Sequence, residues 1–478
     1  MTIKFDNEIE KISDYCFADI QFSNNVINEA SYALMDAMAC AILALNNLDY
    51  NKHTQPVIHH FTRSSTDINS IAIPGTPHYL DLFQSSYVLG CMIRWLDFND
   101  TWLAKEWGHP SDNLAALLPA IIFHQKSTGK TITLSTLIDA LIKSYEIQGI
   151  LALDNSFNQR GFDHVILVKL ASTALSTKLI GGNKEQCNKA LSNAFLDGAS
   201  LRTFRHKPNT GWRKSWAAAN SSRQALQHAF NSVHGEMGYP QVLSDKDWGF
   251  NHIILNEVPF ASRREYTDYV MTNILYKISY PIEFHAQTAV ECAIKLHDTF
   301  KNRYHCDIHN IESISLATHE PALRIINKNG PLTNPADRDH CIQYGIAVAL
   351  LFGDLTSNMY SDEFSKHADI DKLRDKIIIY EDNDFTNIYY AEDKRAIANR
   401  VTIQYMDTQI DTMEILYPLG HKKRRSESRA ALKSKFTHAI NSHFSKHSAN
   451  EIIHSFNDTD KLLNYSILDW LSLWVREK

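Results

Sequence analysis

Apolar residues recur at every third or fourth position through most of the chain, which is the spacing of helices that bury one face. The stretch with Leu82, Leu89, Ile93 and Leu96 shows this clearly. The same spacing predicts further helices at residues 137–145, 165–180, 215–233, 283–300 and 337–351. Gly181 follows one of these stretches and is typical of a residue that ends a helix.

Polar and apolar residues alternate in the second half of the chain, as they do in half-buried strands. Three such runs occur, at residues 311–318, 401–405 and 413–417. Helical spacing resumes at about residue 426 and continues to the end. The sequence therefore predicts a mainly α fold with a smaller α+β domain. We place the helical domain at residues 1–268, joined by the C-terminal helices of 406–478, and the smaller domain at 269–405.

The composition indicates which kinds of partner the protein does not attract by charge. The 478 residues carry 48 Lys and Arg against 54 Asp and Glu, a net charge of −6 that gives no general attraction to nucleic acid or to an anionic membrane. The start of the chain is polar, and no run of 18 uncharged apolar residues occurs, so we expect no membrane helix. We expect a soluble cytoplasmic protein.

The cysteines and histidines argue against a metal cofactor. The seven cysteines are scattered and form no Cys-x-x-Cys pair, which fits a reducing compartment and disfavours a zinc ribbon or an iron–sulfur loop. The 23 histidines include no His-Glu-x-x-His motif. The sequence therefore predicts no cofactor and no metal.

One segment, residues 94–113, gathers the residue types of acid–base chemistry. Asp97 and Thr101 are four residues apart and share a face if the preceding helix continues one more turn. Pro110 predicts a break at His109, and Ser111 or the residue after it can cap a new helix. A histidine just before a helix can act as a general base or acid near neutral pH. The alternative, that His109 only fills a polar turn and Asp97 caps a helix, stays open.

At these residues the sequence resembles a known family. The run LDFNDTWLAKEWGHPSDN (96–113) is similar to the signature of the 2-methylcitrate dehydratase branch of the MmgE/PrpD family. Further segments agree in the same order: GFDHVILVKLAST (161–173), RHKPNTGWRKSWAAANSSRQA (205–225), YKISYPIEFHAQTAVECA (276–293), NPADRDHCIQYGIAVALLFG (334–353) and YPLGHKKRR (417–425). The resemblance covers nearly the whole chain.

The resemblance implies a homodimer of two-domain subunits, each with a helical domain, a lid domain and an active site between them. It implies the removal of water from the tricarboxylate 2-methylcitrate, in propionate breakdown by the methylcitrate cycle, without an iron–sulfur cluster. Citrate and cis-aconitate are further possible substrates. Two alternatives are a cis-aconitate decarboxylase and an inactive tricarboxylate-binding homodimer. The loop has its long form, with Lys105, Glu106 and Trp107 before His109, and this favours the dehydratase branch.

The resemblance also assigns roles to residues. It makes His109 and Asp97 the proton-transfer pair, with Asp97 orienting the imidazole. The groups expected to bind carboxylates or the leaving hydroxyl are Thr101, His164, Lys277 and Tyr344. The candidate substrate-binding cations are Lys207, Arg213 and Lys214, of which at least one is expected to be a surface charge. His164 as a helix-start residue, Tyr344 as a core tyrosine with a bonded hydroxyl and His285 as a structural histidine remain alternatives.

Overall fold

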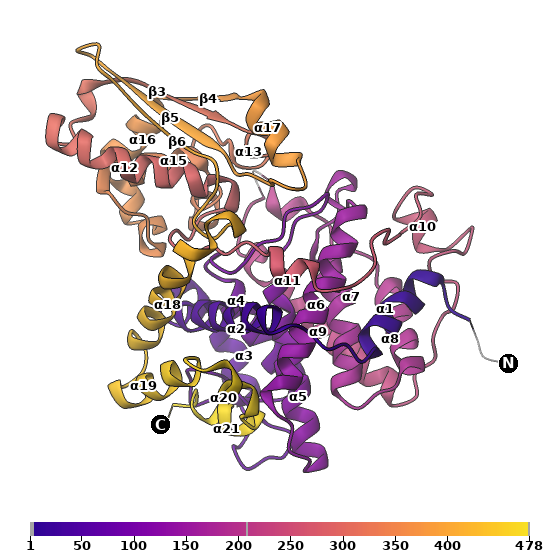
Figure 1. Cartoon of the computed structure of the whole chain (residues 1–478). Helices are drawn as coiled ribbons and strands as arrows, with labels where there is room; N and C mark the ends of the chain where they lie inside the picture. Colours follow the sequence, from indigo (N-terminus) through magenta and orange to yellow (C-terminus); the bar gives the residue numbers. More distant parts are fainter. Residues whose placement is uncertain (1–3, 207–208, 477–478) are drawn as a thin grey trace. The chain divides into compact units, whose positions relative to one another are not determined.

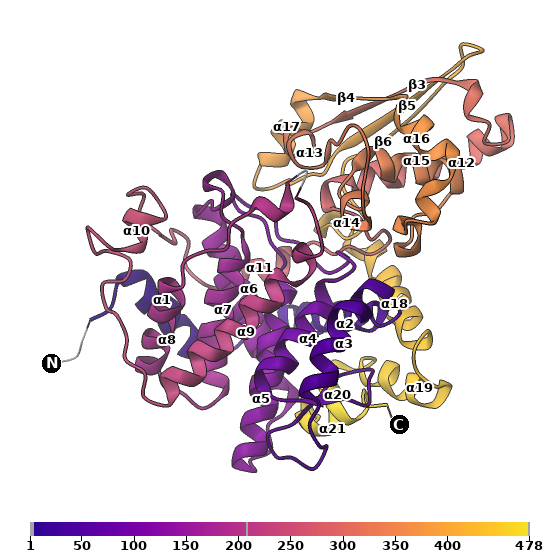
Figure 2. The same ribbon diagram turned by 180° about the vertical axis from the view of Figure 1, so that it is seen from behind.

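The computed structural model describes residues 4–206 and 209–476 and separates into two compact units of different architecture (Figures 1 and 2). The larger unit holds the described residues up to Asn209, Arg213–Ile274 and the chain from Leu432 onward. The smaller unit holds Thr210–Trp212 and Leu275–Ala431. The larger is helical and the smaller contains a four-stranded sheet with helices, which confirms the predicted fold class.

The core of the larger unit is built from long helices. They are α1 (Asn7–Phe17), α2 (Asn24–Ala44), α3 (Leu48–Phe61), α4 (Leu82–Arg94), α5 (Leu114–Thr128), α6 (Leu134–Asp154), α7 (Val165–Leu179), α8 (Lys184–Leu196) and α9 (Arg213–Val233). Helix α7 packs against α8 and α9, and α4 packs against α9. Every residue of α7 except Lys178 is buried, because this run consists mainly of aliphatic and small residues. The short α10 (Phe250–Ile253) and α11 (Tyr269–Asn273) follow.

Helix α2 is the one helix of the described chain that is long and apolar enough to cross a membrane by length and composition. It carries Glu29 and Asp36, which is why no uncharged apolar run is found in the sequence. Within the larger unit, 78% of the most apolar stretch of α2 is buried, and the helix packs against α4 and α6. These contacts are those of a core helix.

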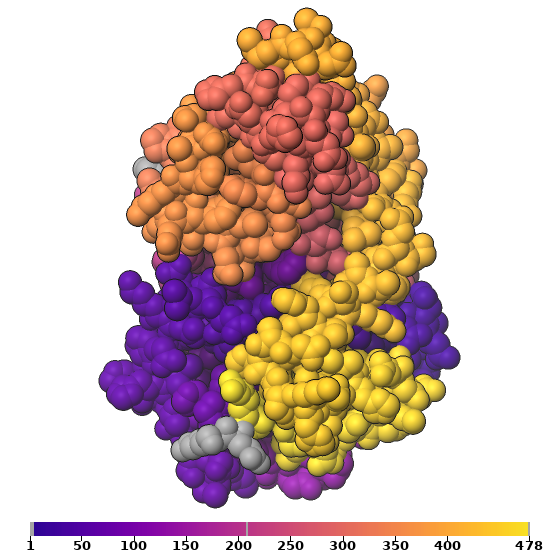
Figure 3. Space-filling view, turned by 90° about the vertical axis from the view of Figure 1, so that its left-hand side faces the viewer, coloured from indigo at the N-terminus to yellow at the C-terminus, as the bar shows by residue number. Residues whose placement is uncertain are grey.

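The C-terminal helices return to the larger unit. They are α18 (Arg425–Asn441), within which the chain passes between the units, α19 (Lys446–Ser455), α20 (Thr459–Asn464) and α21 (Ile467–Ser472). Lys435 of α18 is buried and donates from Nζ to Asp36 Oδ1 (2.7 Å) and to the main-chain oxygen of Phe98 (2.8 Å). Figure 3 shows the C-terminal segment, in yellow, on the surface beside the indigo N-terminal part of this unit.

The smaller unit is organised around a four-stranded sheet of order β4-β3-β5-β6. The strands are β3 (Ile311–Thr318), β4 (Ile377–Glu381), β5 (Asn399–Tyr405) and β6 (Ile410–Ile415). Strand β4 runs parallel to β3, and the other two pairs are antiparallel. The apolar core lies between the sheet and the helices α12 (Gln287–Tyr304), α15 (Ile342–Phe352) and α16 (Ala368–Arg374).

The structure moves some of the predicted boundaries. The chain returns to the larger unit at Leu432 rather than at residue 406, because β6 pairs with β5 and so belongs to the sheet. The helix predicted at 337–351 is divided into α14 (Pro335–Arg338) and α15. Strand β4, an edge strand, was not among the predicted strands.

Candidate active site

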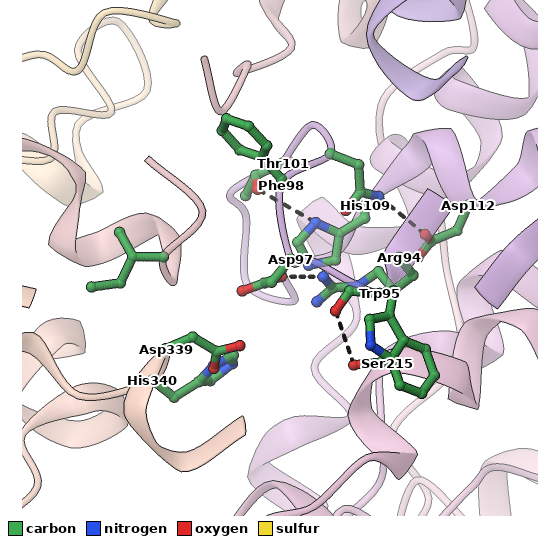
Figure 4. Close-up of polar contacts among 12 residues, drawn as sticks. Arg94, Trp95, Asp97, Phe98, Thr101, His109, Asp112, Ser215, Asp339 and His340 are labelled. Atoms are coloured by element: carbon green, nitrogen blue, oxygen red, sulfur yellow. Dashed lines mark hydrogen bonds and ion pairs between the residues drawn. The ribbon is translucent and has the colours of Figure 1, made fainter. Parts of the chain in front are cut away.

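The loop after α4 brings Thr101 and His109 together. Helix α4 ends at Arg94, so the chain does not make the extra turn that would place Asp97 and Thr101 on one helix face. The main chains of Trp102 and Gly108 exchange two hydrogen bonds, of 2.8 and 3.1 Å, and fold the loop back on itself. Thr101 Oγ1 then lies 3.4 Å from His109 Nδ1 (Figure 4).

His109 is buried, and its ring is oriented by the main chain. Its Nδ1 lies 2.6 Å from the carbonyl oxygen of Asp100, and a carbonyl oxygen only accepts, so Nδ1 carries the hydrogen. A neutral ring in this tautomer has its basic lone pair on Nε2. The Asp100 carbonyl thus takes the orienting role that the sequence analysis assigned to the carboxylate of Asp97.

Asp97 forms a buried ion pair with Arg94, which donates from its guanidinium to Oδ1 (Figure 4). Asp97 has a φ of 49°, in the left-handed region that non-glycine residues rarely occupy. Such backbone strain is concentrated at functional sites. The sequence analysis overlooked Arg94, because at the end of an apolar helix it looked like an ordinary C-terminal cation.

Ser111 and Asp112 do not cap a helix by their side chains, contrary to the sequence prediction. They lie inside a 3₁₀ turn, Pro110–Asn113, that leads directly into α5. Asp100 Oδ1 instead accepts from the main-chain nitrogen of Ser111 (3.1 Å) and from its Oγ (2.6 Å). Burial raises the pKa of Asp100 to about 6 and that of Asp112 to about 7. The turn after His109 is therefore held by buried carboxyl groups that titrate close to neutral pH.

His164 stands at the start of α7, and its ring centre is 5.8 Å from that of His109. The ring is buried, and neither nitrogen has a hydrogen-bond partner, although Nδ1 lies 3.6 Å from Asp163 Oδ1. Burial lowers the pKa of His164 to about 3; Asp163 opposes this effect, and the guanidinium groups of Arg205 and Arg202 add to it. His164 is therefore neutral at neutral pH.

A buried aspartate and two arginines surround this ring. Arg205 Nη2 donates to Asp163 Oδ1 (3.0 Å), its Nε donates to Oδ2, and Arg202 Nη1 lies 3.8 Å from the same carboxylate. Burial alone would raise the pKa of Asp163, but Arg205 holds it well below its usual range. Sequence reasoning did not identify this group, since Arg202 and Arg205 are about 40 residues from their partner.

Two of the predicted site residues, Lys277 and Tyr344, belong to the smaller unit. Lys277 is fully buried in the segment after α11. Burial would raise the pKa of Glu283, but His285, His340 and Lys277 lower it to about 2. His285 is itself buried, with Glu283 on Nδ1 (2.8 Å) and the Tyr389 hydroxyl on Nε2 (3.0 Å), which fits the structural role considered for it.

Tyr344 lies on α15 and is buried in the apolar core of the smaller unit. Its hydroxyl donates to the main-chain oxygen of Met359 (2.6 Å), and burial raises the pKa of Tyr344. Of the two readings of this residue, the hydrogen bond favours a core tyrosine whose hydroxyl is already engaged.

The three candidate cations differ. Arg213 begins α9 and is exposed, with its guanidinium 4.4 Å from the centre of the Trp216 ring. Lys214 is buried on the same helix. Lys207 lies outside the described residues. An exposed Arg213 agrees with the expectation of at least one surface charge, and Lys214 is the better candidate for holding a ligand.

Within residues 4–206 and 209–476, no group of three or more His, Cys, Asp or Glu side chains is arranged to hold a metal ion. The seven cysteines are free thiols, and all but Cys306 are buried.

Sequence comparison extends this picture to the whole chain. Residues 10–263 match the MmgE/PrpD N-terminal domain, and residues 280–460 match the MmgE/PrpD C-terminal domain. The chain belongs to the MmgE/PrpD family. Apart from Thr210–Trp212, the first matched range lies in the helical unit, and the second contains the four-stranded sheet.

Several relatives align from end to end. The 2-methylcitrate dehydratase of Salmonella typhimurium is 42% identical over 98% of both chains. That of Escherichia coli K12 is 42% identical over 99% of this chain and 98% of its own. That of Cupriavidus necator is 43% identical over 98% of this chain and 97% of its own.

Proposed function

We propose that this protein is a hydro-lyase that removes water from 2-methylcitrate to give 2-methyl-cis-aconitate, a step of the methylcitrate cycle of propionate breakdown. The observation that carries the proposal is the identity of about 42% to 2-methylcitrate dehydratases over nearly the full length of both chains. The buried His109 supplies a group suited to proton transfer, and the ring of His164 lies 5.8 Å from it between ring centres.

The reaction needs a base and stabilisation of negative charge. The proton to be removed lies on the methyl-bearing carbon, next to a carboxylate, and its removal adds charge to a substrate that already has three carboxylates. His109, with its lone pair on Nε2, is the proposed base. Lys277 and Lys214 are the proposed partners of substrate carboxylates, because positive charge placed in advance stabilises the carbanion-like state.

The leaving hydroxyl needs a proton as the second bond breaks. His109 becomes an imidazolium in the first step and is then an acid able to give that proton to the hydroxyl. His164 stays neutral because burial lowers its pKa to about 3, so its proposed role is to hydrogen-bond a hydroxyl or carboxylate. Thr101, whose Oγ1 lies 3.4 Å from His109 Nδ1, has the same proposed role, and the proposed role of Asp97 is to hold Arg94 through their ion pair.

The test is an incubation of the purified protein with 2-methylcitrate. Formation of the conjugated alkene, followed by ultraviolet absorbance and by a mass loss of one water, supports the proposal. Release of CO₂ from cis-aconitate without dehydration of 2-methylcitrate would instead assign the decarboxylase reaction. Absence of both reactions, with binding of the tricarboxylate retained, would indicate the inactive binding protein. Citrate and cis-aconitate are tested beside it as further substrates.

We also propose that the enzyme acts as a cytoplasmic homodimer without a bound metal. The resemblance within the family supports the dimer, and the free thiols of the seven cysteines suit a reducing compartment. Light scattering coupled to size exclusion measures the subunit number directly. A mass of one chain would contradict the dimer.

A further inference from the structure

The loop before His109 contains a buried carboxylate that the proposed reaction does not use. Glu106 is fully buried. Its Oε2 accepts from the main-chain nitrogens of Phe157 (2.6 Å) and Asn158 (2.7 Å) and from the side-chain amide of Asn158 (2.9 Å). Three donors on one carboxylate oxygen join this loop to the segment that leads to His164.

Other contacts join the same two segments. The side-chain amide of Asn158 donates to the main-chain oxygen of Lys105 (3.2 Å), and the Glu106 nitrogen donates to the oxygen of Ala152 at the end of α6 (3.0 Å). The Arg202 guanidinium lies 5.2 Å from the centre of the Trp107 ring. That arginine is one of the two beside Asp163, the residue before His164. Residues 105–107 therefore contact residues on both sides of α7, Asn158 before it and Arg202 after it.

His164 depends on its surroundings for its orientation. Neither of its ring nitrogens is hydrogen-bonded, so packing and the 3.6 Å contact with Asp163 hold the ring. Gly108 is part of that packing: a Cβ built there would lie 3.4 Å from His164 Cδ2 and 3.0 Å from the Gln148 amide. Gly108 directly precedes His109. A shift of the loop would therefore move one ring and change the space available to the other.

We propose that Glu106 is a positioning residue that joins the loop of His109 to the segment of His164 and so fixes the two rings relative to each other. The kinetic test of this inference rests on the proposed function. The test by histidine NMR signals rests only on the contact between the two rings and needs no turnover. Misplacing reacting groups by about 1 Å can lower a rate about 100-fold. The isosteric Gln keeps an oxygen that accepts from the 157–158 main chain, whereas Ala does not.

The chain offers a matched control. Glu146 is equally buried and accepts from the main-chain nitrogens of Thr267 and Val270, each at 2.8 Å. Glu146→Ala removes the same kind of contact between α6 and the α11 segment, and leaves the bonds of Glu106 to Phe157 and Asn158 in place. A purely structural role for Glu106 predicts that Glu106→Ala and Glu146→Ala lower the melting temperature and the activity alike.

The experiment compares Glu106→Ala, Glu106→Gln and Glu146→Ala in the full-length protein. We expect Glu106→Ala to lower kcat about 10- to 100-fold with little change in KM and to shift the acid limb of the kcat/KM pH profile. Glu106→Gln should recover most of the rate, and Glu146→Ala should keep the wild-type kcat and pH profile. Equal kcat and pH profiles for the two alanine variants would overturn the proposal.

A second measurement separates this inference from the proposed reaction. The ring signals of the two histidines are assigned in NMR spectra by their loss in His109→Gln and His164→Gln. Glu106→Ala is expected to move both sets of signals, and Glu146→Ala neither. If the wild type does not dehydrate 2-methylcitrate but this pattern holds, the positioning role stands and the reaction assignment fails. Unmoved signals in a folded Glu106→Ala protein would overturn the positioning role.

Discussion

At the scale of residues, the His109 site combines what a sequence shows with what only the fold supplies. Pro110 predicted the break at His109, and the structure places the histidine in extended backbone just before a 3₁₀ turn. The orienting carbonyl of Asp100 could not be predicted, because any residue type has a carbonyl. The left-handed backbone of Asp97 and its ion pair with Arg94 could not be predicted either, since no local pattern of residues marks them.

His164 carries a prediction about pH. Its pKa is lowered to about 3 in the folded state, against about 6.5 unfolded, so the native protein excludes a proton that the unfolded chain takes up. Stability is therefore fully present above pH 6.5 and falls as pH drops toward 3, with a slope of up to about 1.4 kcal/mol per pH unit. His164→Gln should flatten the free energy of unfolding between pH 6.5 and 4, measured by urea denaturation. An unchanged slope would show that His164 binds a proton in the native state.

At the scale of elements, the periodic patterns predicted the helices α4, α6, α7, α9, α12 and α15 and the strands β3, β5 and β6. Strand β3 falls at the predicted residues 311–318. Asn183 caps α8 and forms a capping box with Gln186. Strand β4 lacks this signal: Ile377–Glu381 begins with three isoleucines and lies at the sheet edge, so its pattern does not alternate. Strand β6 pairs with β5 across a short connection at residues 406–409 and begins three residues before the predicted run of 413–417.

The ion pair between Lys435 of α18 and Asp36 of α2 is the contact to test at this scale. Both side chains are almost fully buried, and breaking a buried pair costs about 3–5 kcal/mol, because the remaining charge has no compensation. Lys435→Met should lower the free energy of unfolding by about that amount. The exposed pair of Lys461 and Asp458, 3.7 Å apart, is the control. Lys461→Met should change stability by less than about 1 kcal/mol. Similar losses for both variants would contradict this account.

At the scale of the whole molecule, both units belong to the same family of proteins. The N- and C-terminal family domains match residues 10–263 and 280–460, so the family match includes residues of both units. His109 and His164 lie in the helical unit, and the buried Lys277 lies in the smaller unit. The local motifs could be found in the sequence, but the arginines around Asp163 come together only through tertiary folding.

Metal independence is a prediction about the whole enzyme. The proposed proton transfer uses imidazole groups alone, so dehydration should continue after incubation with EDTA and in air. The measurement is the initial rate before and after dialysis against the chelator, with metal content determined on the same sample. Recovery of a lost rate on adding iron, or one iron per chain, would contradict the mechanism.

The most direct test of the account is the rate of 2-methylcitrate dehydration by the wild type and by His109→Gln. Glutamine keeps much of the side-chain volume but does not exchange protons near neutral pH. The account predicts that the wild type forms 2-methyl-cis-aconitate and that the variant, folded to the same melting temperature within a few degrees, loses about 10²–10⁴ in kcat. A variant with near wild-type kcat would show that His109 is structural and would contradict the central claim.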